Sequence, residues 1–210
     1  MRYERKYRIE HATWQEVQAV LHRLPLSFQL AYPDRFINSI YLDSPSLHTV
    51  QDNLSGISSR SKFRVRWYGE DLESATKPIL EKKIKSNQLG TKEHSPLPDF
   101  QLADGFDFTS FLLENSPACQ LLSPVVLVRY LRSYYVSLDG QVRATIDRGL
   151  QYLHFHGNIW MKNSALHDPA VILEIKYDEK LEGQLDEMFQ SLPFRLSKNS
   201  KFVGGLFGFY

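Results

Sequence analysis

The organisation of the chain follows from the stretch Ser61-Lys62-Phe63-Arg64-Val65-Arg66-Trp67-Tyr68. Cationic and apolar residues alternate strictly along it. Because successive side chains of a β-strand point to opposite faces, this alternation predicts a strand with one apolar face and one cationic face. The cationic face carries Lys62, Arg64 and Arg66. Like charges on one sheet face repel each other, so this face requires water, counter-ions or a bound anion.

The composition is that of an ordinary globular protein. The chain has 210 residues, of which 42% are apolar, and this length suffices for one domain with a substantial core. The net charge is only +1, which argues against a general nucleic-acid coating protein, because such proteins are usually basic overall. A basic site in this chain is therefore local.

The sequence indicates a soluble protein of a reducing compartment. The single cysteine, Cys119, allows no internal disulfide and is predicted to be a buried small residue. Residues 1–6 are charged, unlike a secretory leader, and no apolar run approaches the roughly 18 residues that span a bilayer. We expect a cytoplasmic protein without a membrane segment of its own.

Further segments are predicted to be strands because they alternate or are rich in β-branched and aromatic residues. The expected strands cover residues 2–9, 35–43, 61–68, 78–85, 124–138, 141–148, 150–155 and 170–177, with a hairpin turn at Asp139-Gly140. The expected helices cover residues 13–24, 44–54, 108–121 and 179–191. Thr13 and Glu16 predict a capping box at the start of the first helix. Residues 86–107 and 156–168 are expected to be loops, and nothing divides residues 1–210 into more than one domain.

Charged residues recur on one face of these strands. The charged faces carry Glu4, Lys6, Arg8, Lys62, Arg64, Arg66, Glu81, Lys83, Arg129, Arg143, Glu174 and Lys176. Two α+β architectures fit: an open antiparallel sheet with one solvated face, or a closed antiparallel barrel with a charged lumen, in either case flanked by the helices. The alternation alone does not decide between them.

The residue types on the charged faces suit phosphate chemistry. Arginine predominates in the central strands, and its planar guanidinium binds phosphate oxygens through two parallel hydrogen bonds. Carboxylates on separate strands suit Mg²⁺ or Mn²⁺, which prefer oxygen ligands and keep several waters. Cations together with a carboxylate-held metal are typical of phosphoryl transfer, where positioning and charge neutralisation supply most of the catalysis.

A set of short motifs, in order along nearly the whole chain, resembles the VTC domain, the polyphosphate polymerase domain of the triphosphate tunnel metalloenzyme (CYTH-like) superfamily. The motifs are Glu4-Arg5-Lys6-Tyr7, Lys62-x-Arg64-x-Arg66, Glu81-x-Lys83, Arg129, Val142-Arg143-x-x-x-Asp147, Leu173-Glu174-x-Lys176 and Ser197-Lys198-x-Ser200-Lys201. The resemblance implies a closed eight-stranded antiparallel tunnel with a charged lumen, a divalent metal (Mn²⁺ or Mg²⁺), and chemistry on triphosphates or polyphosphate.

The resemblance also implies roles for individual residues. It makes Lys6, Arg64, Arg66, Arg129, Arg143 and Glu174 catalytic. It assigns phosphate binding to Lys6, Lys62, Arg64, Arg66, Lys83, Arg129, Arg143, Lys176, Lys198, Ser200 and Lys201. Glu174 is expected to hold the metal, with Glu4 and Glu81 as further metal ligands.

One position departs from the family. Many triphosphate tunnel enzymes begin with Glu-x-Glu-x-Lys, but the first Glu is Arg2 here. This favours polyphosphate synthesis from ATP, by an ATP:polyphosphate phosphotransferase reaction, over the alternative of tripolyphosphate or nucleoside triphosphate hydrolysis. A second alternative is a non-catalytic polyphosphate-binding module, which Glu174 disfavours because an anion binder gains nothing from a carboxylate among its cations.

The expected partners are a nucleoside triphosphate and inorganic polyphosphate, with no nucleic acid; a membrane-protein partner and the oligomeric state are left open.

Simpler interpretations exist for several residues. His154 and His156 alternate, but are expected to be surface histidines, since no further Cys or His lies at zinc spacing. Lys198 and Lys201 would also suit a helix C-terminus.

Overall fold

The fold, taken from a computed structural model, is described for residues 2–86, 89–103, 105–116, 119–156, 159–161 and 164–208. The chain forms two compact units, each assembled from segments that are distant in sequence. Unit 1 consists of the segment ending at Arg35, Tyr130–Leu150 and Asp168–Asn199; unit 2 consists of Phe36–Arg129, Gln151–His167 and the segment starting at Ser200. The assignment of residues 1–210 to one domain stays a prediction.

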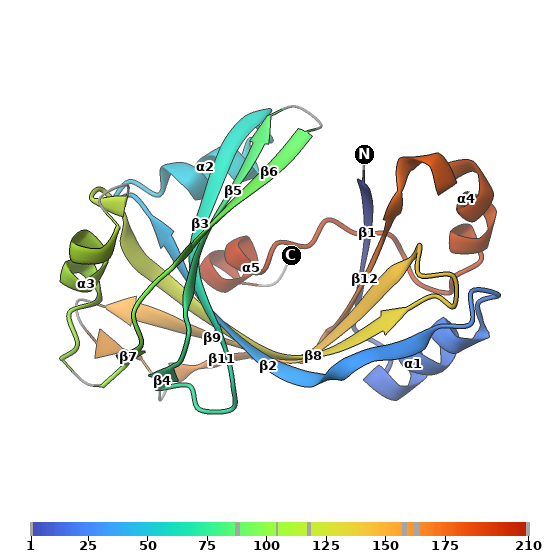
Figure 1. The fold of residues 1–210 in the computed structure, drawn as a ribbon, viewed down its shortest axis with the longest axis horizontal. Helices are drawn as coiled ribbons and strands as arrows, with labels where there is room; N and C mark the ends of the chain where they lie inside the picture. Colours follow the sequence, from blue (N-terminus) through green and yellow to red (C-terminus); the bar gives the residue numbers. More distant parts are fainter. Residues whose placement is uncertain are drawn as a thin grey trace. The chain divides into compact units, whose positions relative to one another are not determined.

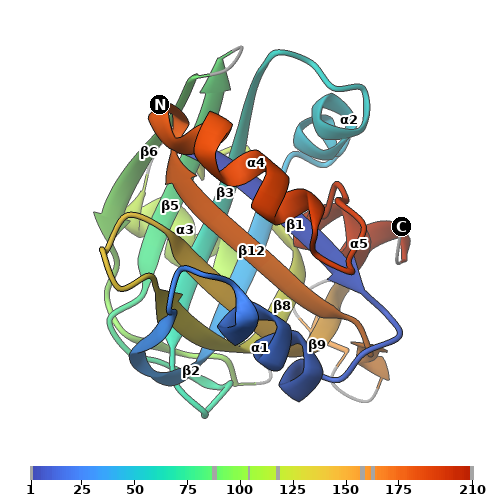
Figure 2. The ribbon, with the colours of Figure 1, turned by 90° about the vertical axis from the view of Figure 1, so that its right-hand side faces the viewer.

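Strand β12 (Val171–Asp178) is central in unit 1. It pairs antiparallel with β1 (Arg2–Ile9) on one side and with β9 (Arg143–His156) on the other. The helical elements of this unit are α1 (Trp14–Arg23), η3 (Glu179–Leu181) and α4 (Glu182–Gln190). Figure 2 shows α1 and α4 in front of β12, so they cover one face of this sheet.

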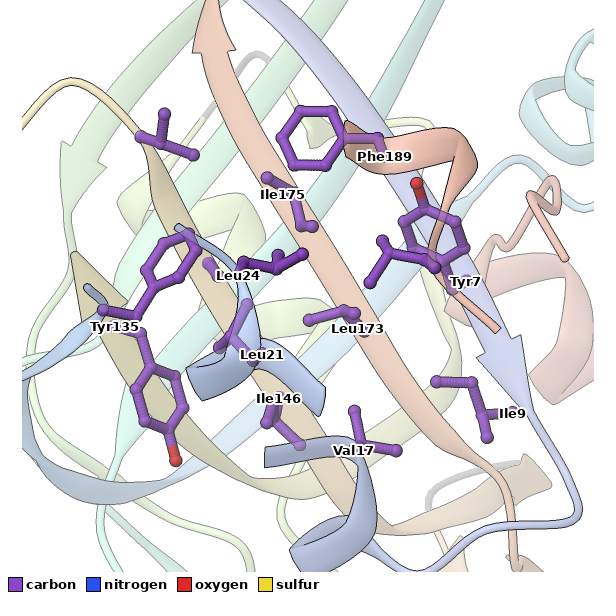
Figure 3. Packing of buried hydrophobic residues seen from close by; sticks show 14 of the residues in the cluster. Tyr7, Ile9, Val17, Leu21, Leu24, Tyr135, Ile146, Leu173, Ile175 and Phe189 are labelled. Atoms are coloured by element: carbon purple, nitrogen blue, oxygen red, sulfur yellow. The ribbon is translucent and has the colours of Figure 1, made fainter. Parts of the chain in front are cut away.

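The core of unit 1 lies between that sheet face and the two helices. Leu173 and Ile175 of β12 point to the same side and are fully buried with Val17 and Leu21 of α1 and Phe189 of α4 (Figure 3). Burial of one such side chain contributes about 1.5–3 kcal/mol. The expected capping box at the start of α1 is confirmed, since Thr13 and Glu16 exchange side-chain and backbone hydrogen bonds. The opposite face of β1 and β12 is left for charged residues.

Strand β3 (Ser59–Tyr68) is central in unit 2. It lies between β2 (Gln29–Asp43) and β5 (Ile79–Ser86), and β6 (Leu89–Pro96) follows at the edge (Figure 1). The remaining elements are α2 (His48–Leu54), β4 (Ser74–Ala75), β7 (Phe100–Gln101), α3 (Phe108–Asn115), β10 (Ile159–Trp160), β11 (Leu166–Asp168, which ends in unit 1) and α5 (Lys201–Phe207).

The core of unit 2 packs on the apolar face of β3. Val65 and Trp67 are fully buried, and the ring of Phe100 contacts both Trp67 and the aromatic side chains of α3. Cys119 is buried in the same core, as expected. The alternation in residues 61–68 is therefore confirmed: the apolar side faces a core, and the cationic side faces away from it.

The strands β2, β8 (Ser123–Val136) and β9 contribute residues to both units. The hydrogen-bonded order of strands is β1-β12-β9-β8-β2-β3-β5-β6. An α+β fold with a large antiparallel sheet is thus confirmed. The order has β1 and β6 at its ends, and the described residues record no pairing that closes it into a barrel.

Two predicted loops contain strands. Residues 89–96 were expected in a loop because they include a glycine, a proline and mostly polar residues, but they form β6, paired with β5 from Ile79↔Pro96 to Ser86↔Leu89. An edge strand needs only one partner and no apolar face, so these residues suffice there. The predicted loop 156–168 likewise contains β10 and β11.

Several helix boundaries also differ from the predictions. Helix α2 begins at His48, not at the predicted start near Ser44, because Leu47 adopts a left-handed conformation and Asp43 accepts hydrogen bonds from the amides of Thr49 and Val50. Helix α3 ends at Asn115, short of residue 121. Helix α5 was not predicted, because its sequence contains two glycines and lies in a tail that offered no clear periodicity.

Candidate functional site

The cationic face of β3 is flanked by complementary residues in unit 2. Register places Arg64 opposite Tyr41 of β2 and Glu81 of β5, and places Arg66 opposite Ser39 of β2. Arg66 is only 8% exposed, and its Nε donates to Ser39 Oγ at 3.2 Å. These guanidinium groups are thus held in fixed positions at the sheet surface.

Glu81 neutralises part of the charge on this face. Its Oε2 accepts a 2.5 Å hydrogen bond from Arg64 Nε, and its Oε1 lies 3.7 Å from Arg66 Nη1. Burial opposes ionisation of Glu81, but Arg64 and Arg66 outweigh it and hold the pKa of this carboxyl below its ordinary value. One carboxylate between two arginines leaves the face with excess positive charge.

The C-terminal helix α5 lies beside this face. Ser200 is its N-cap and accepts hydrogen bonds from Val203 N and, at 3.2 Å, from Lys62 Nζ. Phe202 stacks on Tyr41 with ring centroids 4.9 Å apart and planes 10° from parallel. The structure therefore brings Ser200 together with Lys62, and places Lys201 in the first turn of a helix rather than at a helix C-terminus.

Lys83 belongs to the same face but is more exposed. It pairs in register with Lys62 on one side and with Lys92 of β6 on the other, which gives three lysines in one row across β3, β5 and β6. Lys92 was not among the predicted site residues, because β6 was predicted to be a loop. A row of lysines at neighbouring positions is stabilised by an anion with several charges.

Unit 1 carries a second charged face, on β1, β12 and β9. Lys6 lies opposite Glu174, and Glu4 lies opposite Lys176. Lys6 Nζ is 2.5 Å from Glu4 Oε1, and Lys176 forms ion pairs with both Glu4, at 3.6 Å, and Glu174. The structure thus brings together four of the predicted site residues in one network of alternating charge.

The two carboxylates of this network are close enough to influence each other. Burial and the charge of Glu174 raise the pKa of Glu4, while Lys6 and Lys176 lower it by more, so the net pKa lies below the ordinary value. Arg143 of β9 lies opposite Lys176 and is exposed. The backbone amide of Ser197 donates a hydrogen bond to the carbonyl oxygen of Lys6, and the next residue, Lys198, is exposed.

Arg129 is not placed with the other predicted residues. Its guanidinium lies 4.4 Å from the ring centroid of Phe36 and donates to the backbone carbonyl of Glu70. Arg132 was not predicted from the sequence. It forms a bidentate ion pair with the fully buried Asp147. Burial disfavours the charge of Arg132, but Asp147 outweighs it and raises the arginine pKa further. Glu174 also contributes to this shift, so Arg132 belongs to the electrostatic network of unit 1.

The residues and their order match a known family over almost the whole length. The model of the VTC domain family matches residues 1–106 and 110–210. The chain belongs to the VTC domain family. The resemblance seen in the sequence is thus confirmed, and it places the chain among the triphosphate tunnel (CYTH-like) proteins, which handle phosphoryl groups on triphosphates and are generally metal-dependent enzymes.

Solved structures support the fold of this VTC domain. A candidate adenylyl cyclase from Hippeastrum with a dominant triphosphatase activity is 16% identical, with a TM-score of 0.55 over 98% of this chain and 95% of that one. A Pyrococcus horikoshii protein is 15% identical, with a TM-score of 0.55 over 97% of each chain. A candidate adenylate cyclase from Bacillus halodurans is 11% identical, with a TM-score of 0.56 over 97% and 96%. Among curated proteins, none matches.

The donor set of the VTC domain fits a hard divalent cation in unit 1. Within the described residues, no group of three or more His, Cys, Asp or Glu side chains could hold a metal. Mg²⁺, however, is commonly bound through one or two carboxylates together with substrate phosphates and water. Glu4 and Glu174 provide such a pair. Glu81 is committed to two arginines in unit 2, which suits it better to positioning them.

Two further observations bear on the VTC domain as a whole. No helix within the described ranges is long and apolar enough to cross a membrane. The backbone of His154 accepts a hydrogen bond from Met161 N, while the side chain of His156 lies outside the described residues.

Proposed function

We propose that this VTC domain transfers phosphoryl groups from ATP to a growing polyphosphate chain, with Mn²⁺ or Mg²⁺ as cofactor. The observation that carries the proposal is the face formed by Lys62, Arg64 and Arg66, fixed by Glu81 and Ser39 and bordered by the N-terminus of α5. Its excess positive charge is matched by a linear polyanion. The closed eight-stranded tunnel implied by the resemblance is part of this proposal.

The residues of unit 2 would bind and align phosphates. Arg64 and Arg66 present planar donors whose positions are set before a ligand arrives, and this preorganisation is the main contribution that a protein makes to phosphoryl transfer. Lys62 and Ser200 border the face and would contact the next phosphate along the chain. The terminal phosphate of an existing chain is already ionised near neutral pH, so its oxygen can attack the γ-phosphorus of ATP without a strong general base. The bond between the γ-phosphorus and the bridging oxygen of the β-phosphate breaks, and ADP leaves.

The residues of unit 1 would hold the metal ion. Glu4 and Glu174 are its ligands in this proposal, and the bound cation would neutralise charge on the phosphate oxygens. Lys6, Lys176 and Arg143 provide further donors near these carboxylates. Arg2, in place of the glutamate common in the superfamily, leaves a smaller set of metal-binding carboxylates and favours transfer to phosphate over hydrolysis.

Hydrolysis of triphosphates is the second candidate, because the Hippeastrum protein of similar fold has a dominant triphosphatase activity. The two candidates differ only in the nucleophile. Incubation of the purified protein with ATP and Mn²⁺, followed by electrophoresis for chains and a colorimetric assay for phosphate, separates them. Long chains support the proposal. Free phosphate without chains, from ATP or tripolyphosphate, supports hydrolysis. Binding of polyphosphate without turnover would leave only a binding module. A cytoplasmic location stays a prediction.

A further inference from the structure

Tyr41 is a buried polar residue on the cationic face of unit 2 that neither the family motifs nor the proposed function uses. It is 7% exposed and lies on β2, opposite Arg64 of β3. A tyrosine at such a position normally finds a partner for its hydroxyl group, because a buried hydroxyl without a hydrogen bond destabilises the fold. The surroundings of this hydroxyl group therefore indicate what it binds.

The phenolic oxygen already accepts one hydrogen bond. Arg64 Nη1 donates to it at 3.3 Å, and the same guanidinium is oriented by its hydrogen bond from Nε to Glu81. An arginine can only donate, so the hydrogen of the Tyr41 hydroxyl must point elsewhere. Among the described residues, the structure gives this hydrogen no acceptor.

The charged groups around Tyr41 are mostly cations. Arg64 and Arg66 face it from β3 and Lys201 faces it from α5, whereas Glu81 of β5 is bound to the arginines. On β2 itself, Asp43 is occupied by the amides at the start of α2. Burial raises the pKa of the Tyr41 phenol, but these cations outweigh it and leave the pKa below its ordinary value. This environment attracts an anionic acceptor.

The ring of Tyr41 is fixed independently of the hydroxyl group. It stacks on Phe202 at 4.9 Å, and Phe202 is itself 1% exposed in α5. A phenylalanine would keep this stack and lose only the hydroxyl group. The hydroxyl is therefore not required to hold the ring, which separates a role toward a ligand from a role in packing.

We infer that the Tyr41 hydroxyl donates a hydrogen bond to a phosphate oxygen of the bound triphosphate or polyphosphate. The inference rests on the proposed function, because it assigns a new phosphate contact to the same face. Arg64 and Tyr41 then act together: the guanidinium holds the phenolic oxygen, and the phenolic hydrogen binds the ligand. The contact adds a neutral donor, which binds phosphate only while it is protonated.

The test compares the wild-type protein with Y41F and with Y68F by calorimetric titration of tripolyphosphate. Tyr68 lies on the same strand as Arg64 but is 44% exposed, so it is the matched control. A lost hydrogen bond to a charged ligand corresponds to about 10- to 100-fold weaker binding, which we expect for Y41F, with Y68F unchanged. The melting temperatures of the free proteins show whether Y41F keeps its fold.

A spectroscopic measurement distinguishes direct contact from an effect through Arg64. The tyrosinate absorbance of the wild-type protein minus that of Y41F reports ionisation of Tyr41. Bound tripolyphosphate should shift the ionisation of Tyr41 to higher pH, because the phosphate accepts the phenolic hydrogen and repels the phenolate. Equal affinities of wild type and Y41F, or an ionisation that does not shift, would overturn the inference and leave the proposed function standing. Absence of tripolyphosphate binding by the wild-type protein would overturn both.

Discussion

Arg64 Nε lies 2.5 Å from Glu81 Oε2 across the adjacent strands β3 and β5, and the same carboxylate reaches Arg66 through its other oxygen. The sequence suggested Glu81 as a metal ligand, whereas the structure surrounds it with guanidinium groups. Removal of one partner from such a largely buried cluster leaves the remaining charges without compensation.

The variant Glu81→Gln should therefore lose stability, by about 1–3 kcal/mol, while keeping the metal dependence of the wild type. Added polyphosphate should restore much of the lost melting temperature, because it supplies the missing negative charge. Thermal unfolding with and without polyphosphate measures the loss of stability and its restoration. Activity as a function of Mn²⁺ concentration measures the metal dependence. A weaker Mn²⁺ dependence in this variant would show that Glu81 is a metal ligand.

Acidification should weaken the wild-type protein through the same carboxylate. The pKa of Glu81 is lowered from 4.5 on folding, since Arg64 and Arg66 outweigh burial. Its contribution to stability is complete above pH 4.5 and is lost as the pH falls below that value toward the pKa of the folded state. The stability difference between wild type and E81Q should thus be constant near neutrality and shrink below pH 4.5. A difference that does not change with pH would contradict the ion pairs.

Glu174→Gln should strongly reduce catalysis with little change in fold. Glu174 shares Lys176 with Glu4, and these two carboxylates are the proposed metal ligands. Loss of a charge-stabilising group of this kind commonly reduces the rate by about 100- to 1,000-fold. The Mn²⁺ titration of the remaining activity should shift to higher concentration. Glu179→Gln, in the exposed 3₁₀ turn η3 of the same unit, is the control and should match the wild type.

Gly205→Ala should displace α5, because a Cβ atom there would lie 2.7 Å from Tyr152 and 3.0 Å from Val126. Overpacking of this kind costs about 1–3 kcal/mol. Activity should fall with it, since α5 carries Lys201 and its N-cap Ser200 contacts Lys62. At Gly204 the nearest atom would be 3.7 Å away, so Gly204→Ala is the control. Equal melting temperatures and activities for the two variants would contradict the packing of α5.

Arg129→Ala should keep most of its activity, although the family resemblance made Arg129 catalytic. Its guanidinium packs on Phe36 and binds the Glu70 carbonyl, away from the other predicted residues of unit 2. We expect a loss of about 1 kcal/mol in stability from the missing cation–π contact and hydrogen bond. Arg66→Ala, in the same unit, should be inactive. If both variants are inactive and Arg129→Ala is still folded, Arg129 belongs to the site.

The sequence predicted much of this fold and less of the site. Strict alternation marked β3 and its cationic face because period two depends only on neighbouring residues. The partner of Arg64 could not be predicted, since the register between β3 and β5 is a non-local property. Strand β6 was predicted to be a loop because an edge strand needs little β propensity.

Arg132 could have been found from the hairpin. It lies seven residues before Asp139, and Asp147 lies seven residues after Gly140, so a tight turn at Asp139-Gly140 places the two opposite each other. Arg129 and Arg132 differ in parity along β8, so they point to opposite faces of the strand. The alternation along β8 does not show which of its faces carries charge, so Arg132 was missed.

The central claim is that the γ-phosphate of ATP becomes part of a polyphosphate chain. The most direct measurement supplies ATP labelled at the γ-phosphate, Mn²⁺ and a short unlabelled polyphosphate primer, and follows the label by electrophoresis for the wild type and Arg66→Ala. Label in chains that lengthen with time in the wild type, and in none with Arg66→Ala, is the predicted result. Label that appears only as free phosphate would contradict the account and establish a triphosphate hydrolase.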